Sequence, residues 1–261
     1  LGECPYDSGG YFIVNGSEKV LIAQENMAAN RVSVFRMPAT SKYSYMAEVR
    51  SCDVQSYRPA RTLHLRLLAS ATSKGALTVQ HRMDMRSANC IHVRLPYINA
   101  DVPMAIVFRA MGHLGDKDIL QHICYDFNDR ALLELLRPSL EEGRDVSTKL
   151  DARNFIGARG MMRENERAQW VRDLFEKQVL PHINDKRNKK TLKAYYIGYA
   201  INKLCNVALG RLPESDRDHY GNKRLNLAGS LLSGLFRKAF EKVVKDTKRR
   251  LDDCSSRGDL S

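Results

Sequence analysis

The sequence predicts an α+β protein, with a β-rich N-terminal part followed by a helical part. Apolar and polar residues alternate from Gly10 to about Leu95, whereas apolar residues recur at helical spacing after Pro96. A βαβ protein would interleave these two patterns, and this sequence keeps them apart. The 261 residues fit one large domain or two modest ones.

The charge balance favours a polyanionic partner. Lys and Arg total 42 against 30 Asp and Glu, a formal net charge of +12 at pH 7. Such an excess points first to nucleic acid. The longest apolar stretch, residues 102–108, is far shorter than the roughly 20 residues of a membrane-spanning helix. No secretory signal opens the chain, so we expect a soluble intracellular protein.

The predicted strands begin with a hairpin. Residues 11–14 and 19–23 flank a turn at 15–18, where Asn-Gly readily adopts positive φ. Alternating runs at 31–35, 62–68 and 90–95 predict further strands, and in the last run Ile91, Val93 and Leu95 share one face. Loops are predicted at residues 51–59 and 70–75.

Helices follow after Pro96. Asp116 is placed to cap a helix that carries Ile119 and Ile123. A helix over about 128–136 should end before Pro138, because proline disfavours helical backbone in the preceding residue. Another, over 164–180, should stop at Pro181. Residues 192–209 predict a helix with one apolar stripe, made of Leu192, Tyr195, Tyr196, Tyr199, Ala200, Leu204, Val207 and Ala208.

The last predicted helix has the clearest apolar stripe. Its members recur at three- and four-residue steps from residue 228 to 243. They are Ala228, Leu231, Leu232, Leu235, Phe236, Ala239, Phe240 and Val243. The opposite face is basic, and the tail after Leu251 is expected to fray.

Motifs of metal and cofactor chemistry are not apparent. The six cysteines are widely spaced and form no C-x-x-C pair, which predicts buried free thiols and no metal site. Phosphate-loop, dinucleotide-binding and nucleophile-elbow motifs are missing. The G-x-x-G at Gly157–Gly160 predicts a loop between helices more readily than a phosphate-binding loop.

The acidic run at residues 214–218 allows two interpretations. Clustered carboxylates could hold Mg²⁺ for phosphoryl chemistry. Ion pairs to Arg217, Lys223 and Arg224 are the simpler interpretation. Two basic zones, residues 185–193 and 214–250, could be solvated surface, while the net charge of +12 favours contact with nucleic acid. Any such contact would be with the backbone, because no base-reading motif accompanies them.

Longer stretches carry a resemblance to a known family. They are residues 4–25 (CPYDSGGYFIVNGSEKVLIAQE), 122–129 (HICYDFND), 155–160 (FIGARG), 180–183 (LPHI) and 216–225 (DRDHYGNKRL). In this order they resemble the second-largest subunit of eukaryotic DNA-directed RNA polymerase II, a nuclear nucleotidyltransferase. The segment from residue 37 to 89 departs most from the family pattern.

The resemblance implies a fragment with three parts. Residues 1–27 would end the first protrusion segment, 28–213 would form the lobe domain, and 214–261 would return into the protrusion. In the family these regions form a wall of the DNA cleft, and the lobe docks the general initiation factor F. The catalytic Mg²⁺ of the whole enzyme is held by the largest subunit, so this fragment is expected to carry no catalytic residues, metal or cofactor.

The same resemblance points to the nucleic-acid-binding residues. Lys223 and Arg224 follow a predicted turn at residues 220–222 and would face phosphates of the DNA or the RNA–DNA hybrid, with Asp216 and Asp218 orienting neighbouring cations. A salt-bridge network among these four residues is the competing hypothesis. For the whole chain, the alternative is a stand-alone basic nucleic-acid-binding module, and an independent enzyme is the least supported.

Overall fold

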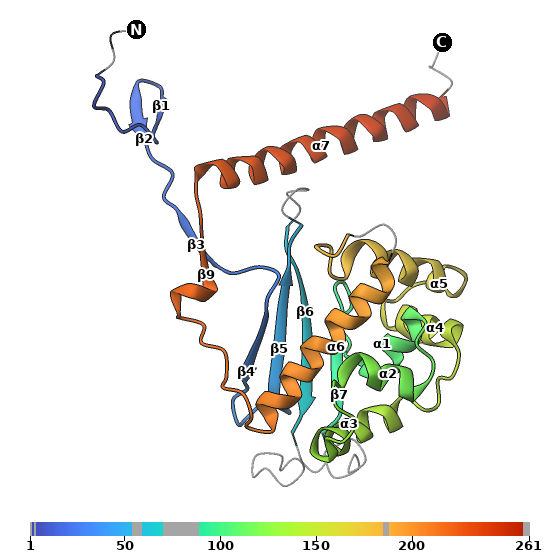
Figure 1. Cartoon of the computed structure of the whole chain (residues 1–261). Coiled ribbons are helices and arrows are strands. Elements are labelled where there is room, and N and C mark those ends of the chain that lie inside the picture. The colour runs from blue at the N-terminus through green and yellow to red at the C-terminus, as the bar shows by residue number, and fades with distance from the viewer. Residues whose placement is uncertain (1, 3, 54–58, 70–88, 185–187, 258–261) are drawn as a thin grey trace. The chain divides into compact units, whose positions relative to one another are not determined.

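The computed structural model describes residues 2, 4–53, 59–69, 89–184 and 188–257. These residues form two compact units. Unit 1 holds the residues up to Ala28, those from Arg217 onward, and Pro59. Unit 2 holds the residues from Ala29 to Asp216 other than Pro59. The predicted α+β class is confirmed, with strands in the N-terminal half and helices after them (Figure 1). No helix among the described residues is long and apolar enough to cross a membrane.

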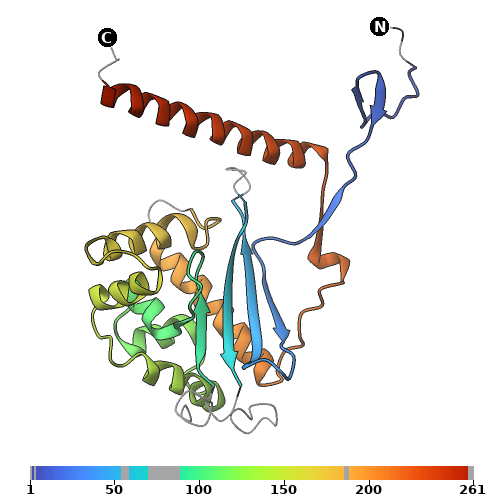
Figure 2. The same cartoon turned by 180° about the vertical axis from the view of Figure 1, so that it is seen from behind.

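Unit 2 is built on a five-stranded antiparallel sheet in the order β4-β5-β6-β7-β8. Apolar residues alternate along β6 and β7, and those at Leu63, Leu65, Ile91 and Val93 are buried on one face. Figures 1 and 2 show helix α6 crossing the sheet. The strands span Val32–Arg36 (β4), Tyr43–Ser51 (β5), Arg61–Leu68 (β6), Ile91–Arg94 (β7) and Val102–Pro103 (β8).

Most of the predicted strands are confirmed, but strand β5, which lies between β4 and β6, was missed. Its alternation is interrupted by a register shift between Tyr43 and Tyr45 where it pairs with β6. Most of the predicted loop at 51–59, and all of the one at 70–75, lie outside the described residues. The apolar stretch at 102–108 becomes the short strand β8 and the start of a buried helix.

The helices follow the sheet in the chain. They span Met104–Met111 (α1), Asp116–Ile123 (α2), Arg130–Glu142 (α3), Lys149–Arg159 (α4), Glu164–Asp173 (α5) and Lys189–Ala208 (α6), with a π-helical turn, η3, at Leu174–Gln178. Every residue of α1 is buried. The 164–180 prediction is confirmed in its buried residues, which include Val171, Leu174 and Val179.

Two predicted helix boundaries are wrong. Gly115 is the residue before α2, and Asp116 lies inside its first turn, where its carboxylate accepts from Arg109 Nη2 at 2.8 Å. Helix α3 continues through Pro138. Buried Leu132 and Leu136 hold this helix against the core, and their burial outweighs the roughly 3 kcal/mol that an internal proline costs.

The Gly157–Gly160 motif is not a loop between helices. Gly157 lies within α4, and Gly160 ends that helix. A β-carbon at Gly157 would approach Arg167 Cβ to 2.5 Å, and one at Gly160 would approach the Trp170 ring to 2.7 Å. The two glycines therefore let α5 pack closely on α4, and this packing explains the motif.

Helix α6 is rotated relative to the sequence prediction. Leu192, Tyr195 and Tyr199 are 40%, 53% and 45% exposed, and the buried face carries Lys193, Ala194, Ile197, Gly198, Ala200, Ile201, Leu204, Cys205 and Val207. The cause is a close approach to α2, since a β-carbon at Gly198 would lie 2.0 Å from the His122 carbonyl oxygen. Asn202 Nδ2 donates to the Ile123 carbonyl at 2.9 Å on the same face.

The buried Lys193 closes the π-helical turn. Its ammonium donates to the carbonyls of Phe175 at 2.7 Å, Glu176 at 3.1 Å and Val179 at 2.5 Å. These groups lie at the end of a helical segment, where carbonyls lack partners within the helix. Burial lowers the pKa of Lys193 to about 7.

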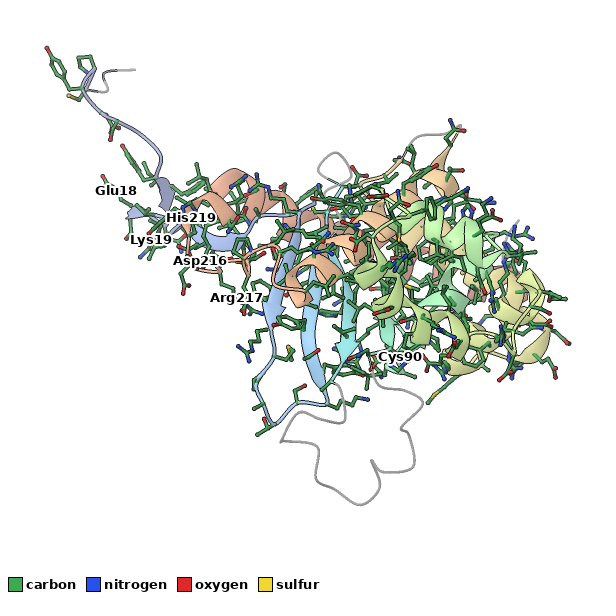
Figure 3. All side chains as sticks on the ribbon, turned by 60° about the horizontal axis from the view of Figure 1, so that its bottom comes forward. Glu18, Lys19, Cys90, Asp216, Arg217 and His219 are labelled. Carbon is green, nitrogen blue, oxygen red and sulfur yellow. The ribbon has the colours of Figure 1, made fainter. Side chains whose placement is uncertain are left out.

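All six cysteines are free, and half of them are buried. Cys90, at the start of β7 (Figure 3), Cys124 and Cys205 are buried, whereas Cys4 and Cys254 are exposed and Cys52 is half-buried. Burial raises the pKa of Cys90 to about 12 and that of Cys124 to about 11, so both remain protonated near neutral pH. The prediction of free thiols is confirmed. The prediction that they are buried is wrong for Cys4 and Cys254, which are exposed.

Substitution of Gly198 by alanine should destabilise unit 2. The added methyl group would collide with the backbone of α2, and overpacking of this kind costs about 1–3 kcal/mol. Urea unfolding followed by the fluorescence of Trp170, the one tryptophan in the chain, measures the loss. Gly229→Ala, where a β-carbon meets nothing within 4 Å, is the control, and equal effects of both substitutions would contradict the packing argument.

Lys193 should make stability depend on pH. Its pKa is near 10.5 in the unfolded chain and about 7 in the folded one, so the unfolded state binds more protons between these values. The free energy of unfolding should therefore rise by up to about 1 kcal/mol per pH unit from pH 7 to 9, relative to Lys193→Met. Urea titrations of both proteins at several pH values measure the difference, and parallel curves would refute it.

Candidate nucleic-acid interface

The predicted site lies on a two-stranded antiparallel ribbon in unit 1. Strand β3, Gln24–Met27, pairs with β9, Lys223–Asn226, so that Met27 lies opposite Lys223 and Asn26 opposite Arg224. The ribbon thus joins residues from the two ends of the chain. The predicted hairpin is also present, as β1, Phe12–Val14, and β2, Ser17–Lys19. Its turn is only Asn15–Gly16, both at positive φ, so the second strand starts at Ser17 and ends at Lys19. The predicted strand over 19–23 is therefore wrong beyond Lys19.

A short turn precedes β9 and orients its first residues. Residues Tyr220–Asn222 form a single 3₁₀ turn, η4. The Gly221 amide donates to His219 Nδ1 at 3.0 Å, and the Ala28 amide donates to the Asn222 carbonyl at 2.8 Å. Figure 3 labels Arg217 and His219 in the segment that leads into the turn. The predicted turn at residues 220–222 is confirmed.

Lys223 forms a cross-strand ion pair. Its Nζ lies 2.7 Å from Glu25 Oε1, and its side chain is 20% exposed. The two residues are diagonal neighbours on one face of the ribbon. The hydrogen bond to Glu25 raises the pKa of Lys223, with smaller contributions from the charges of Glu25 and Asp218. Lys223 therefore has a structural partner within its own unit.

Arg224 lies on the opposite face of the same strand, because successive strand residues alternate. Its Nη1 donates to the carbonyls of Gly221 at 3.2 Å and Lys223 at 2.6 Å. The residue is exposed, and no carboxylate within 4 Å of it is found among the described residues. Backbone carbonyls orient this guanidinium and leave its net charge uncompensated.

The residues of the acidic run at 214–218 have different partners. Glu214 Oε2 accepts from the Arg36 amide at 3.3 Å, and the Ser215 amide donates to the Val34 carbonyl at 2.8 Å, so these two residues pair with the edge of β4. Asp218 contributes to the charge environment of Lys223. In the part of the chain that the structure describes, no three His, Cys, Asp or Glu side chains are grouped to hold a metal ion.

The basic zones are less uniformly exposed than predicted. Residues 185–187 lie outside the described residues, and Lys193 is buried. In the second zone, Arg237 pairs with Glu241 at 2.8 Å within helix α7, Ala228–Arg257. That helix continues to Arg257, so the expected fraying after Leu251 is wrong. None of its residues is buried.

The sequence singles out Lys223 and Arg224 as candidate residues, but not their neighbour Glu25. Glu25 is nearly two hundred positions away along the chain, and only the antiparallel register of β3 and β9 brings it beside Lys223. A short strand of mixed polarity carries no periodic signal that would have predicted this pairing.

The family described as RNA polymerase Rpb2, domain 2, matches residues 28–226. This match covers most of the chain and includes β9. The chain belongs to the RNA polymerase Rpb2 domain 2 family. The resemblance predicted from the sequence motifs is therefore confirmed.

Relatives of this Rpb2 domain 2 chain are polymerase subunits. It is 50% identical over 261 residues to DNA-directed RNA polymerase II subunit 2 of Arabidopsis thaliana, covering 99% of this chain and 21% of the relative. The identity to DNA-directed RNA polymerase II subunit RPB2 of Schizosaccharomyces pombe is 42% over 257 residues, 97% of this chain and 20% of the relative. The identity to DNA-directed RNA polymerase subunit Rpo2 of the archaeon Saccharolobus solfataricus is 36% over 261 residues, which cover 99% of this chain and 21% of the relative.

The identity is higher to these two polymerase II relatives than to the archaeal one. The chain corresponds to a region of RNA polymerase II subunit 2 and spans about a fifth of the length of the relatives it matches. The family match includes the described part of unit 2 together with η4 and β9, whereas β1, β2 and α7 lie outside it.

Proposed function

We propose that this chain forms part of a wall of the DNA cleft of RNA polymerase II, in the nucleus, and that it also offers a docking surface to initiation factors. The family membership supports the polymerase assignment. The charge of Arg224, exposed at the start of β9, supports contact with the DNA or the RNA–DNA hybrid, because an uncompensated guanidinium suits a phosphate.

In this proposal unit 2 is the lobe and unit 1 is the pair of flanking protrusion segments. The chain works with the other polymerase subunits, the largest above all, and supplies no catalytic residue itself. The Mg²⁺ of the reaction is held by the largest subunit. The chain's own part is to position nucleic acid through backbone contacts, with Lys223 held by Glu25 and Arg224 free to reach a phosphate.

The alternative is a stand-alone basic nucleic-acid-binding module, which the net charge of +12 would also suit. The apolar stripe of α7 favours the assembled polymerase. Its apolar side chains are 41% to 70% exposed, at Leu232, Leu235, Phe236, Phe240, Val243, Val244 and Leu251. A continuous apolar stripe of this length marks a surface that another segment or subunit covers.

Replacing Arg224 by alanine in the assembled polymerase should weaken nucleic-acid binding at low salt and make the salt dependence shallower. Each lost phosphate contact reduces the slope of log K against log salt by about 0.7–0.9. The dissociation of elongation complexes at several salt concentrations measures this slope. Lys223→Ala should alter the slope less, because its ammonium is already paired with Glu25.

Arg137→Ala is the matched control, since Arg137 is an exposed cation on α3 paired with Glu141. It should leave the slope unchanged. If Lys223→Ala combined with Arg224→Ala prevents subunit assembly, or assembles with an unaltered slope, the two residues belong to a structural network and the proposed phosphate contact is wrong.

In the isolated chain, the amides of α7 should exchange hydrogen rapidly. The helix has no buried residue, so it lacks the packing that normally slows local opening. Hydrogen exchange followed by mass spectrometry should show strong protection of α1 and weak protection of α7. In the assembled polymerase the α7 amides should become protected, and strong protection in the isolated chain would argue against a missing neighbour.

A further inference from the structure

One face of helix α6 is apolar and exposed. Leu192, Tyr195 and Tyr199 recur at steps of three and four residues, so they form a stripe on the side opposite the core. Tyr125 is 73% exposed, and partial burial together with nearby Tyr199 raises its pKa. Leu192, Tyr195 and Tyr199 are not buried in the core of unit 2, although other residues of α6 are.

A pair of histidines lies beside this stripe. The His122 ring is 4.4 Å from the Tyr195 ring and 4.2 Å from the His113 ring, measured between centroids. His122 Nδ1 donates to the Asp118 carbonyl at 2.6 Å, which leaves Nε2 as an acceptor. Nε2 is buried, and within the described residues it has no hydrogen-bond partner. The exposed Tyr195 ring is therefore backed by the buried His122 ring.

Four cations border the same region. Lys149 and Arg153 come from α4, Arg172 from α5 and Lys190 from α6. Lys149 is central, since burial and the charges of Arg153, Lys190 and Arg172 all lower its pKa. None of these four cations has a carboxylate oxygen within 4 Å among the described residues. Asp185, the acidic residue nearest to Lys190 along the chain, lies outside those residues.

The cations and the aromatic stripe are linked through the end of α1. Arg153 Nε donates to the Ala110 carbonyl at 3.3 Å, and Lys149 Nζ would lie 3.1 Å from a β-carbon at Gly112. The ring of the next residue, His113, contacts the His122 ring. Burial is the main cause of the lowered pKa of His113, and the charge of Lys149 contributes to it. The series Lys149, His113, His122 and Tyr195 therefore runs without interruption from the cations to the stripe.

We propose that this aromatic–basic surface binds an acidic peptide segment of a partner protein that carries an apolar side chain. The surface consists of Tyr125, Leu192, Tyr195 and Tyr199 with Lys149, Arg153, Arg172 and Lys190. The partner's apolar side chain packs beside Tyr195, and the peptide carboxylates meet the four cations. Exposed aromatics combined with Arg are the typical composition of such interfaces.

An acidic peptide fits better than a nucleic acid for two reasons. The stripe contains Leu192, and Leu114 is exposed nearby. Contact with an apolar side chain would remove the aliphatic surface of both leucines from water, whereas a phosphate would bury little of it. Asp116 and Asp118 are exposed in the first turn of α2, and the charge of Asp118 reaches His113. A peptide can place its carboxylates at the cations alone, whereas a regularly charged backbone crossing the surface would also meet these aspartates.

This inference deepens the docking part of the proposed function and rests on it. The two can still fail separately, because the site is in unit 2 and the proposed phosphate contact is in unit 1. A polymerase that assembles and keeps the salt slope assigned to Arg224, but binds no acidic peptide, would overturn this inference alone.

The test uses the assembled polymerase and a fluorescein-labelled peptide of glutamates around a Leu-x-x-Phe core. Fluorescence anisotropy should show saturable binding. Tyr195→Ala should weaken it about tenfold, as loss of a central aromatic contact does, and Tyr195→Phe should bind as the unchanged protein does. Lys149→Ala with Lys190→Ala should weaken binding and reduce its salt dependence. The matched controls are Tyr97→Ala, 60% exposed on another loop, and Arg137→Ala on α3.

Each outcome decides the matter. Weakening confined to the surface variants, in polymerases that assemble normally, supports the proposal. Absence of saturable binding, or equal effects of the control variants, overturns it. A single-stranded oligothymidine that competes for the surface and binds more tightly than the peptide would assign the surface to nucleic acid instead, and would also overturn it.

Discussion

Complete burial of helix α1 is the constraint on which unit 2 depends. With no residue of Met104–Met111 left to water, α1 must be surrounded, and it contacts β7, β8, α2, α3, α4 and α6. Even Arg109 is inside, so its guanidinium needs partners there: Asp116 on α2 and the carbonyls of Gly143 and Val146 after α3. A buried charge is tolerated only with such partners, which fixes where α2 and α3 lie.

Close helix packing then determines which side chains reach the surface. Gly198 brings α6 against α2, and this approach turns Lys193 inward and Tyr195 outward. The buried ammonium satisfies carbonyls at the end of η3, while Tyr195 and Tyr199 stay about half exposed on the outer face of α6. One packing contact therefore accounts for both an unusual core residue and an exposed surface.

Unit 1 follows a different principle. Its ribbon and its long helix bury little, and the Lys223–Glu25 ion pair lies near the surface, where such a pair contributes little to stability. This is expected of segments that gain stability from contacts outside their own unit. Arg224 can then present its charge without a competing carboxylate in the described region.

The sequence by itself determined the α+β class, most strands, the helix stripe of 228–243 and the polymerase family, because periodicity and motifs are local properties of the chain. It also singled out Lys223 and Arg224 as neighbours of a turn. Tertiary structure alone decided that Lys223 pairs with Glu25, that α3 passes through Pro138, and that α6 exposes Tyr195. Each depends on contacts between residues distant in sequence, whose packing energy outweighs the local propensities that the sequence records.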